Sequence, residues 1–211
     1  MPHDFDKDYW KQHWRERTDA APGSMATNPP HPYLARETAT LTPGMALDAG
    51  CGAGAEAIWL ASAGWRVTAV DISTEALTLA AARAAAAKVS DRISLVEADL
   101  STWAPDARFD LVMSHYAHPA MPQLDFYARI ATWVKPGGTL LLVGHLHTPG
   151  GTGDDHHPPT EASVTAEGIT ARLGTTAWRI ETADECDRTL TGPGGREVSL
   201  HDVVVRATRL G

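Results

Sequence analysis

The sequence of 211 residues has few cysteines and no long apolar run. Its two cysteines, Cys51 and Cys186, lie far apart, which argues against a disulfide framework or a zinc-binding cysteine pattern and favours a reducing compartment. The start, MPHDFDKDYWKQHW, lacks the apolar core of a signal peptide, and no apolar run approaches the roughly 20 residues of a membrane span. We therefore expect a cytoplasmic protein that does not cross a membrane.

Positive charge is also scarce. The chain has 18 Lys and Arg against 26 Asp and Glu, which gives a formal net charge of −8. Because nucleic-acid binding rests mostly on neutralising phosphates with Lys and Arg, this balance disfavours a nucleic-acid partner and favours a small molecule. The hydrophobic content of 43% suits one globular domain with a substantial core, as a monomer or small homo-oligomer.

The first 41 residues predict a helical cap. A helix is expected over residues 4–19, with Trp10 and Trp14 on one face, which either packs on the domain, closes a site, or does both. The loop over 20–32, AAPGSMATNPPHP, is too long for a tight turn and has the length of loops that line sites. A short helix over 33–41 is expected to follow.

Strands and helices then alternate. Strands are predicted over residues 45–49, 65–70, 93–98, 109–114 and 139–144, and helices over 55–63, 73–89 and 123–134. This spacing predicts βαβ units and a doubly wound, mostly parallel sheet. After a loop, the tail predicts a helix over 161–173 and an antiparallel hairpin of strands 178–187 and 198–209.

The expected fold is therefore α/β, with a seven-stranded Rossmann-like sheet in a single domain. Within it we expect an N-terminal helical lid over 1–41, a cofactor-binding core over 42–145 and a C-terminal loop, helix and hairpin over 146–211.

The residues at the carboxyl ends of the predicted strands indicate the ligand, because open parallel sheets bind ligands there. The run Gly50-Cys51-Gly52-Ala53-Gly54-Ala55 matches the dinucleotide pattern G-x-G-x-x-G/A, but Asp48 before it would repel a pyrophosphate and attract a cationic centre. Asp71 ends the second strand, where an acid can bind ribose hydroxyls, and Asp99 ends the third, where an acid can accept from an exocyclic amine. A nucleoside with a cationic, amino-acid-like tail satisfies all three acids, and S-adenosylmethionine has that form.

Four segments carry a resemblance to the class I S-adenosylmethionine-dependent methyltransferases: ALDAGCGAG, AVDIS, EADL, and FDLVMS followed by KPGGTLLL. The resemblance covers about residues 40–145. It implies S-adenosylmethionine as cofactor, S-adenosylhomocysteine as product, and close approach of the methionine end to the backbone of Gly50 and Gly52. The other implied contacts are Asp48 with the ammonium group, Asp71 with the ribose, Ile72, Asp99 and Leu100 with the adenine, and Ser114 with the methionine end.

The segment after the fourth strand is Ser114-His115-Tyr116-Ala117-His118-Pro119. Family members that methylate the amines of nucleic-acid bases often carry Asn/Asp-Pro-Pro-aromatic there, and that motif is absent. Methyl transfer from a sulfonium needs positioning more than a base, although a hydroxyl or imidazole acceptor can need one. His115, Tyr116 and His118 are therefore the candidate catalytic residues. Ordinary loop histidines or cofactor contacts are the alternative for the two imidazoles.

The start of the chain carries a narrower resemblance. DYWKQHWRER, followed by a Pro-rich loop with Asn28-Pro29, is similar to small-molecule methyltransferases of the tellurite-resistance and thiopurine type. By that likeness Tyr9, Trp10 and Trp14 would form a lid over the cofactor.

Histidines gather after the fifth predicted strand. His145 and His147 alternate, and Asp154-Asp155-His156-His157 follow in the same loop. Histidines and carboxylates at such spacing can ligate a divalent metal, but nothing here matches a closed ligand pattern. We therefore expect no metal, with His145, His147, His156 and His157 as the candidate ligands if one is bound.

Three functions remain open. A Rossmann-fold NAD-type oxidoreductase would bind a pyrophosphate at the glycine turn, against Asp48 and without a second substrate domain. A non-catalytic S-adenosylmethionine-binding module would keep the acids and lack an organised acceptor pocket. The expected function is S-adenosylmethionine-dependent methyl transfer, by in-line displacement, to a small-molecule acceptor.

Overall fold

The computed structural model describes residues 5–16, 27–146, 163–191 and 197–211. The strands are β1 (Met45–Ala49), β2 (Arg66–Asp71), β3 (Ile93–Glu97), β4 (Phe109–His115), β5 (Val134–His145), β6 (Trp178–Thr191) and β7 (Glu197–Arg209). The helices are α1 (Lys7–Glu16), α2 (Pro32–Thr38), α3 (Ala55–Ser62), α4 (Thr74–Ala86), α5 (Gln123–Ala131) and α6 (Ala166–Leu173), with a short 3-10 helix over Ser90–Arg92.

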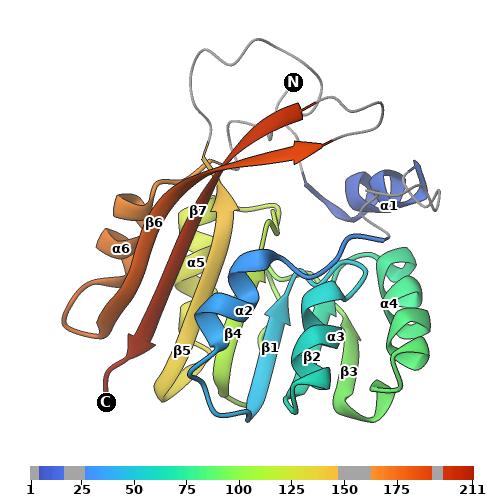
Figure 1. The fold of residues 1–211 in the computed structure, drawn as a ribbon, viewed down its shortest axis with the longest axis horizontal. Coiled ribbons are helices and arrows are strands. Elements are labelled where there is room, and N and C mark those ends of the chain that lie inside the picture. Colours follow the sequence, from blue (N-terminus) through green and yellow to red (C-terminus); the bar gives the residue numbers. More distant parts are fainter. Residues whose placement is uncertain (1–4, 17–26, 147–162, 192–196) are drawn as a thin grey trace.

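The strands form one mixed sheet in the order β3-β2-β1-β4-β5-β7-β6 (Figure 1). Strands β1 to β5 pair in parallel, and β7 pairs antiparallel with both β5 and β6. The strand order reverses between β1 and β4, which is the switch point where such sheets bind ligands. The doubly wound fold and its C-terminal antiparallel hairpin are thus confirmed.

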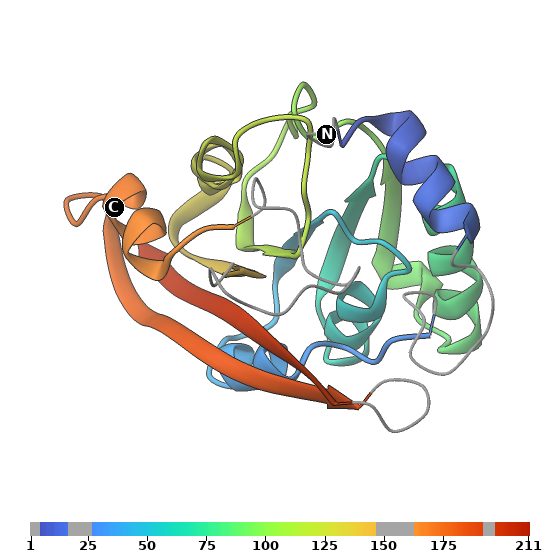
Figure 2. The same cartoon turned by 90° about the horizontal axis from the view of Figure 1, so that it is seen from above.

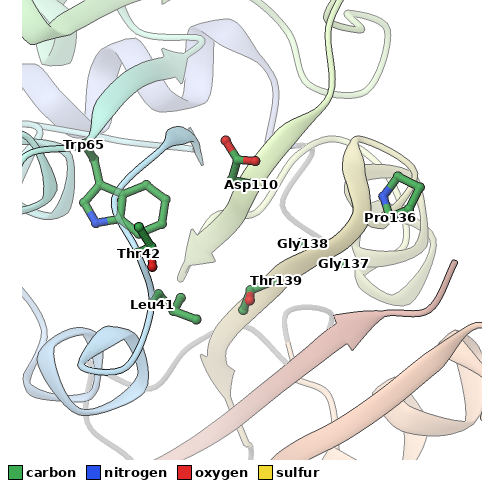
Figure 3. Close-up of a pocket in the computed structure, with 8 residues that line it drawn as sticks. All are labelled: Leu41, Thr42, Trp65, Asp110, Pro136, Gly137, Gly138 and Thr139. Carbon is green, nitrogen blue, oxygen red and sulfur yellow. The ribbon is translucent and has the colours of Figure 1, made fainter.

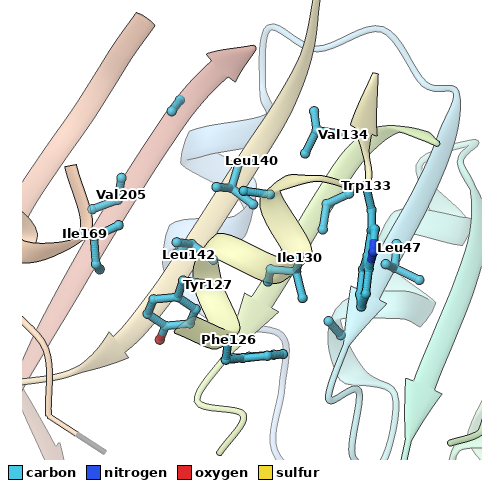
Figure 4. Close-up of a cluster of buried hydrophobic side chains, with 14 of the residues drawn as sticks. Leu47, Phe126, Tyr127, Ile130, Trp133, Val134, Leu140, Leu142, Ile169 and Val205 are labelled. Atoms are coloured by element: carbon cyan, nitrogen blue, oxygen red, sulfur yellow. The ribbon is translucent and has the colours of Figure 1, made fainter. Parts of the chain in front are cut away.

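Helices cover both faces of this sheet. Leu34 of α2, Leu60 of α3 and Leu77 of α4 belong to one hydrophobic cluster with strand residues. The other cluster packs α5 and α6 onto the opposite face (Figure 4), through Phe126, Tyr127, Ile130 and Ile169 against Leu140, Leu142 and Val205. Each fully buried side chain of this size contributes roughly 1.5–3 kcal/mol. Burial on both faces explains why the central strands read as apolar runs such as LLLV.

Two predicted boundaries move for identifiable reasons. Strand β5 begins at Val134 and not at residue 139, because Val134 pairs with Phe109 before the register shifts at the KPGG segment. Helix α6 begins at Ala166, because the Thr165 side chain caps it by accepting from the Gly168 N–H. The predicted cap of α4 is confirmed, since Ser73 Oγ accepts from the Ala76 N–H. Part of the helix expected over 4–19, and of the hairpin loop TGPGG, lies outside the described residues.

The carboxyl and amino ends of the strands differ in what lies beside them. Helix α1 packs against α4 and stands beyond the carboxyl ends of the strands (Figures 1 and 2). An open hollow of about 270 Å³ lies at the amino ends of the strands (Figure 3). It is lined by Leu41, Thr42, Trp65, Asp110, Pro136, Gly137, Gly138 and Thr139. This hollow contains none of the predicted site residues. In the described part of the chain, no helix is long and apolar enough to cross a membrane.

A buried carboxylate ties α2 to the C-terminal hairpin. Glu37 is 3% exposed, and it accepts hydrogen bonds from Thr182 Oγ1 at 2.9 Å and from Arg36 Nε at 2.6 Å. Arg206 of β7 donates to the Glu37 carbonyl oxygen at 2.9 Å. This contact positions the segment just before α2, which contributes to the site described below.

We expect Glu37→Ala to lower the free energy of unfolding by roughly 2–4 kcal/mol, because it removes the acceptor of the Thr182 hydroxyl and the buried carboxylate that lies 3.8 Å from Nη1 of Arg206. Asp184→Ala is the matched control, since it removes an exposed carboxylate that pairs with the same Arg36 at 3.5 Å. It should change stability by less than about 0.5 kcal/mol. Urea unfolding of both variants measures the difference, and equal effects would show that α2 is not anchored by this contact.

Candidate functional site

The glycine turn between β1 and α3 is bound to the end of β2. Both the Gly50 and the Cys51 N–H donate to the Val70 carbonyl, at 2.9 and 3.0 Å. The Gly52 N–H donates to Oδ2 of Asp71 at 2.8 Å. Gly50 has a φ of 85°, and a Cβ there would lie 2.2 Å from the Cβ of Ala117. Only glycine fits this position, because both the backbone conformation and the close approach exclude a side chain.

Carboxyl groups gather around this turn. Asp48 is 1% exposed, and its Oδ2 is buried with no hydrogen-bond partner among the described residues. Burial raises the pKa of Asp48, and the neighbouring Glu56 and Asp71 raise it further. Burial also raises the pKa of Glu56 and of Asp71. A ligand with a cationic N–H donor would satisfy the unpaired oxygen and favour the ionised forms, so the residues present fit the ammonium end of S-adenosylmethionine.

The other predicted cofactor residues stand at the same edge of the sheet. Asp99 follows β3 and accepts the Ser101 N–H at 2.8 Å, beside the buried Leu100. Ile72 is half-buried next to Asp71. Ser114 is fully buried, and its hydroxyl donates to the Ala49 carbonyl at 2.9 Å. The fold therefore brings all these positions together, and their contacts with a cofactor stay predictions.

Helix α1 lies over the glycine turn. Trp14 is 4% exposed, and a Cβ at Gly52 would lie 2.9 Å from its ring. Trp10 Nε1 donates to the His118 carbonyl at 3.1 Å. Lys7 forms an ion pair with Glu97 at the end of β3. The helix thus spans from β3 across the turn to the loop after β4, which is the position that a lid would take.

A buried polar network surrounds Tyr116, the residue that follows β4. The Tyr116 hydroxyl donates to Oδ1 of Asp202 at 2.7 Å and lies 3.0 Å from Nε2 of His31. The other oxygen of Asp202 accepts from Nε of Arg188 at 2.8 Å. Burial and Asp202 raise the pKa of Tyr116. The phenol therefore stays protonated and acts as a donor. Tyr116 also has a left-handed φ of 55°, which is uncommon for a bulky residue.

His118 has a defined orientation. Gln123 Nε2 donates to the Ala117 carbonyl at 2.9 Å, so its Oε1 faces Nδ1 of His118 at 3.2 Å. Because an amide oxygen only accepts, Nδ1 carries the proton and Nε2 keeps its lone pair. The His145 ring stacks on Tyr116 at 4.3 Å between centroids and lies 5.7 Å from His118. Burial lowers the pKa of His118, and it lowers that of His145 to about 3, so both are uncharged at neutral pH.

The imidazoles of His31 and His115 lie near each other beside this network. Both ring nitrogens of His115, and Nδ1 of His31, are buried without a hydrogen-bond partner within the described ranges. Their ring centroids are 6.0 Å apart. Burial lowers the pKa of each imidazole to about 4. The nearby His115 also contributes to the lowered pKa of His31.

Sequence reasoning missed five residues of this site: Glu56, His31, Gln123, Arg188 and Asp202. The sequence held a signal for two of them. Asp202 is an acid that directly precedes the apolar run VVV, and Glu56 directly follows the glycine motif. No group of three His, Cys, Asp or Glu side chains that could hold a metal ion occurs in the described part of the chain. Of the four histidines named as candidate ligands, His147, His156 and His157 lie outside it.

Residues 46–138 match the family described as "Methyltransferase domain". Ribosomal RNA small subunit methyltransferase C of Alcanivorax borkumensis is 34% identical over 114 residues, which are 51% of this chain and 34% of that protein. Thiocyanate methyltransferase 1 of Brassica oleracea is 26% identical over 185 residues, which are 86% of this chain and 79% of that protein. The chain spans 34% of the length of the first relative and 60% of a further one from Arabidopsis thaliana.

Solved structures agree on the fold. TehB from Haemophilus influenzae superposes with a TM-score of 0.68 at 17% identity, over 97% of this chain and 67% of that one. At this identity the likeness shows the fold alone. The match over residues 46–138 and the similarity to thiocyanate methyltransferase 1 support the resemblance to class I S-adenosylmethionine-dependent methyltransferases seen in the sequence.

We expect Gly50→Ala to destabilise the protein by roughly 2–4 kcal/mol, because the added methyl group collides with Ala117 and the backbone is left-handed. Adding Ala117→Gly should remove the collision and leave about 1 kcal/mol of backbone strain. Gly137→Ala is the control for that strain, since its φ is 77° with nothing within 4 Å of the new Cβ. Urea unfolding gives the double-mutant cycle, and strictly additive effects would show that Gly50 and Ala117 do not touch.

We expect His115→Phe to raise the free energy of unfolding at pH 7 by about 1 kcal/mol, because it removes two unsatisfied buried nitrogens. The gap should widen on acidification. The unfolded chain takes up a proton near pH 6.5, whereas folded His115 does so only near its pKa of about 4. The native protein therefore loses stability between about pH 6.5 and 4, by at most about 1.4 kcal/mol per pH unit from this group. Urea unfolding at pH 7, 6 and 5 measures the gap, and a constant gap would mean that folded His115 titrates normally.

Proposed function

We propose that the protein transfers the methyl group of S-adenosylmethionine to a small-molecule acceptor by in-line displacement. The observation that carries this proposal is the buried Asp48, whose Oδ2 has no partner among the described residues, beside Glu56 and Asp71. A cationic ligand is favoured in this field, whereas the pyrophosphate of a nicotinamide cofactor would be repelled.

The cofactor supplies an electrophilic methyl group, and the chain's residues hold and orient it. Asp48 and the backbone of the glycine turn hold the methionine end, and Asp71 accepts from the ribose hydroxyls. Ile72, Asp99 and Leu100 bind the adenine, and Trp10 and Trp14 close the site above the turn. Positioning and exclusion of water supply most of the acceleration in such a displacement.

On the acceptor side we assign different roles to the candidate residues. His118 offers the unprotonated Nε2 that a base needs, because Gln123 holds the proton on Nδ1. Tyr116 positions other groups and does not act as a base, since its hydroxyl donates to Asp202. His115 faces the acceptor with His31.

A small acceptor is supported by two observations. The net charge is −8, and the chain matches most of the length of a relative whose name specifies thiocyanate. The relative that acts on ribosomal RNA is matched over only 34% of its length, so its substrate does not transfer to this chain. Cys51 and Cys186 are free, which favours the cytoplasm as the place of action. We propose a monomer or small homo-oligomer.

Calorimetric titration with S-adenosylhomocysteine, with NAD in a parallel cell, tests the cofactor. We expect binding of the first ligand only, and Asp48→Asn should weaken it by roughly 10- to 100-fold through loss of a charge-assisted hydrogen bond. Asp110→Asn is the control, because this acid lies near the amino end of β4, away from the glycine turn, and pairs with Lys135 at 2.9 Å. Its affinity should stay that of the native protein.

Binding of NAD alone would overturn the proposal. Unchanged affinity of Asp48→Asn would place the ammonium group elsewhere. Asp71→Ala is a poorer test, because both oxygens of Asp71 accept backbone N–H groups, from Gly52 and from Ser73, and the substitution would disturb the turn itself.

A further inference from the structure

Glu56 brings a second carboxylate to the unpaired oxygen of Asp48. It is the second residue of α3, directly after the glycine turn, and its side chain is half-buried. The next N–H of that helix, from Ala57, lies at the Asp48 carboxyl group. Burial raises the pKa of Asp48 most, and of the neighbouring charges Glu56 raises it more than Asp71 does. The two acids therefore lie next to each other where β1 leads into α3.

Among the described residues, neither acid forms an ion pair. Asp48 Oδ2 is buried without a hydrogen-bond partner in that part of the chain. Arg83 is the cation whose charge acts on Glu56. Its N–H groups, however, donate to the carbonyls of Ala53 at 3.2 Å and of Asn28 at 2.9 Å. Buried polar atoms in native proteins nearly always have partners, and two adjacent carboxylates repel each other, so a positively charged donor would resolve both conflicts.

Asp71, the third acid near the turn, is engaged elsewhere. Its two oxygens accept the N–H groups of Gly52 at 2.8 Å and of Ser73 at 2.9 Å. These contacts hold Asp71 at the end of β2, on the side of the turn assigned to the ribose. Glu56 is therefore the acid that remains to accompany Asp48.

We propose that Glu56 is the second carboxylate of the ammonium site, so that the α-amino group of the cofactor is held between Glu56 and Oδ2 of Asp48. The inference rests on the proposed function and adds a binding residue to it. An ammonium group has three N–H donors and no acceptor, so it can donate to both carboxylates at once. Its charge also stabilises the ionised form of both acids, which burial opposes.

Glu56 also makes a structural contact, which a test has to leave in place. Its Oε1 accepts the His31 N–H at 2.9 Å and so ties the segment before α2 to α3. That contact needs an acceptor oxygen and does not need a charge. Glu56→Gln separates the two roles, because its amide oxygen can still accept from His31 while the negative charge is lost.

Calorimetric titration with two ligands tests the role without relying on turnover. One is S-adenosylhomocysteine, and the other is its deaminated analogue, which keeps the carboxylate and lacks the ammonium group. We expect Glu56→Gln to weaken binding of S-adenosylhomocysteine by about 10-fold, because a charge-assisted hydrogen bond is replaced by a neutral one. Binding of the deaminated analogue should not weaken. Glu167→Gln is the matched control, since this exposed acid is likewise the second residue of its helix, α6, and both affinities should stay those of the native protein.

Unchanged affinity of Glu56→Gln for S-adenosylhomocysteine, or an equal loss with both ligands, would overturn the proposal. Asp48→Asn gives a second test in a chain that keeps Glu56. This variant should still prefer S-adenosylhomocysteine to the deaminated analogue, and equal affinity for the two would mean that Asp48 holds the ammonium group alone. Failure of the native protein to bind S-adenosylhomocysteine would instead overturn the proposed function, and this inference with it.

Discussion

The carboxylate of Asp71 is the contact on which the rest of the site depends. It accepts the N–H groups of Gly52 and Ser73, so it joins the glycine turn to the end of β2 and to the residue that caps α4. Fixing the turn places Gly50 against Ala117, and the Ala117 carbonyl in turn orients Gln123. A single chain of close contacts thus runs from Asp71 at the end of β2 to Gln123 at the start of α5, so a displacement at one end would be carried to the other.

The two sides of the site differ in charge. Acids surround the glycine turn, and uncharged imidazoles line the end of β4 and the segment before α2. Burial creates both conditions, because it opposes ionisation of carboxyl and imidazole groups alike. A cation would therefore favour the ionised forms of these acids, while the imidazoles remain available as neutral donors and acceptors. This division suits a reaction in which a positive centre loses its charge beside a group that can take a proton.

The succession of helices and strands along the chain, and the carboxyl ends of the strands as the place of the site, could be predicted from the sequence, because apolar periodicity and the acids at strand ends depend on local residues. Asp48, Asp71 and Asp99 were found in this way. His31 and Asp202 were not, since their roles arise from a contact through Tyr116 between segments far apart in the chain. The start of β5 at Val134 was missed for the same reason, because pairing with Phe109 overrides the turn signal of KPGG.

The residues proposed for the acceptor side also explain why the match to the methyltransferase family leaves the substrate open. The match to the methyltransferase domain covers residues 46–138, which include Asp48, Asp71 and Asp99. His31 precedes it, and Arg188 and Asp202 follow it on the C-terminal hairpin. The hairpin supplies the carboxylate that accepts from Tyr116, and Tyr116 contacts His31, so the groups that we propose for the acceptor side are positioned by segments outside the matched core. A change in the hairpin can therefore alter the acceptor while the cofactor side stays as it is.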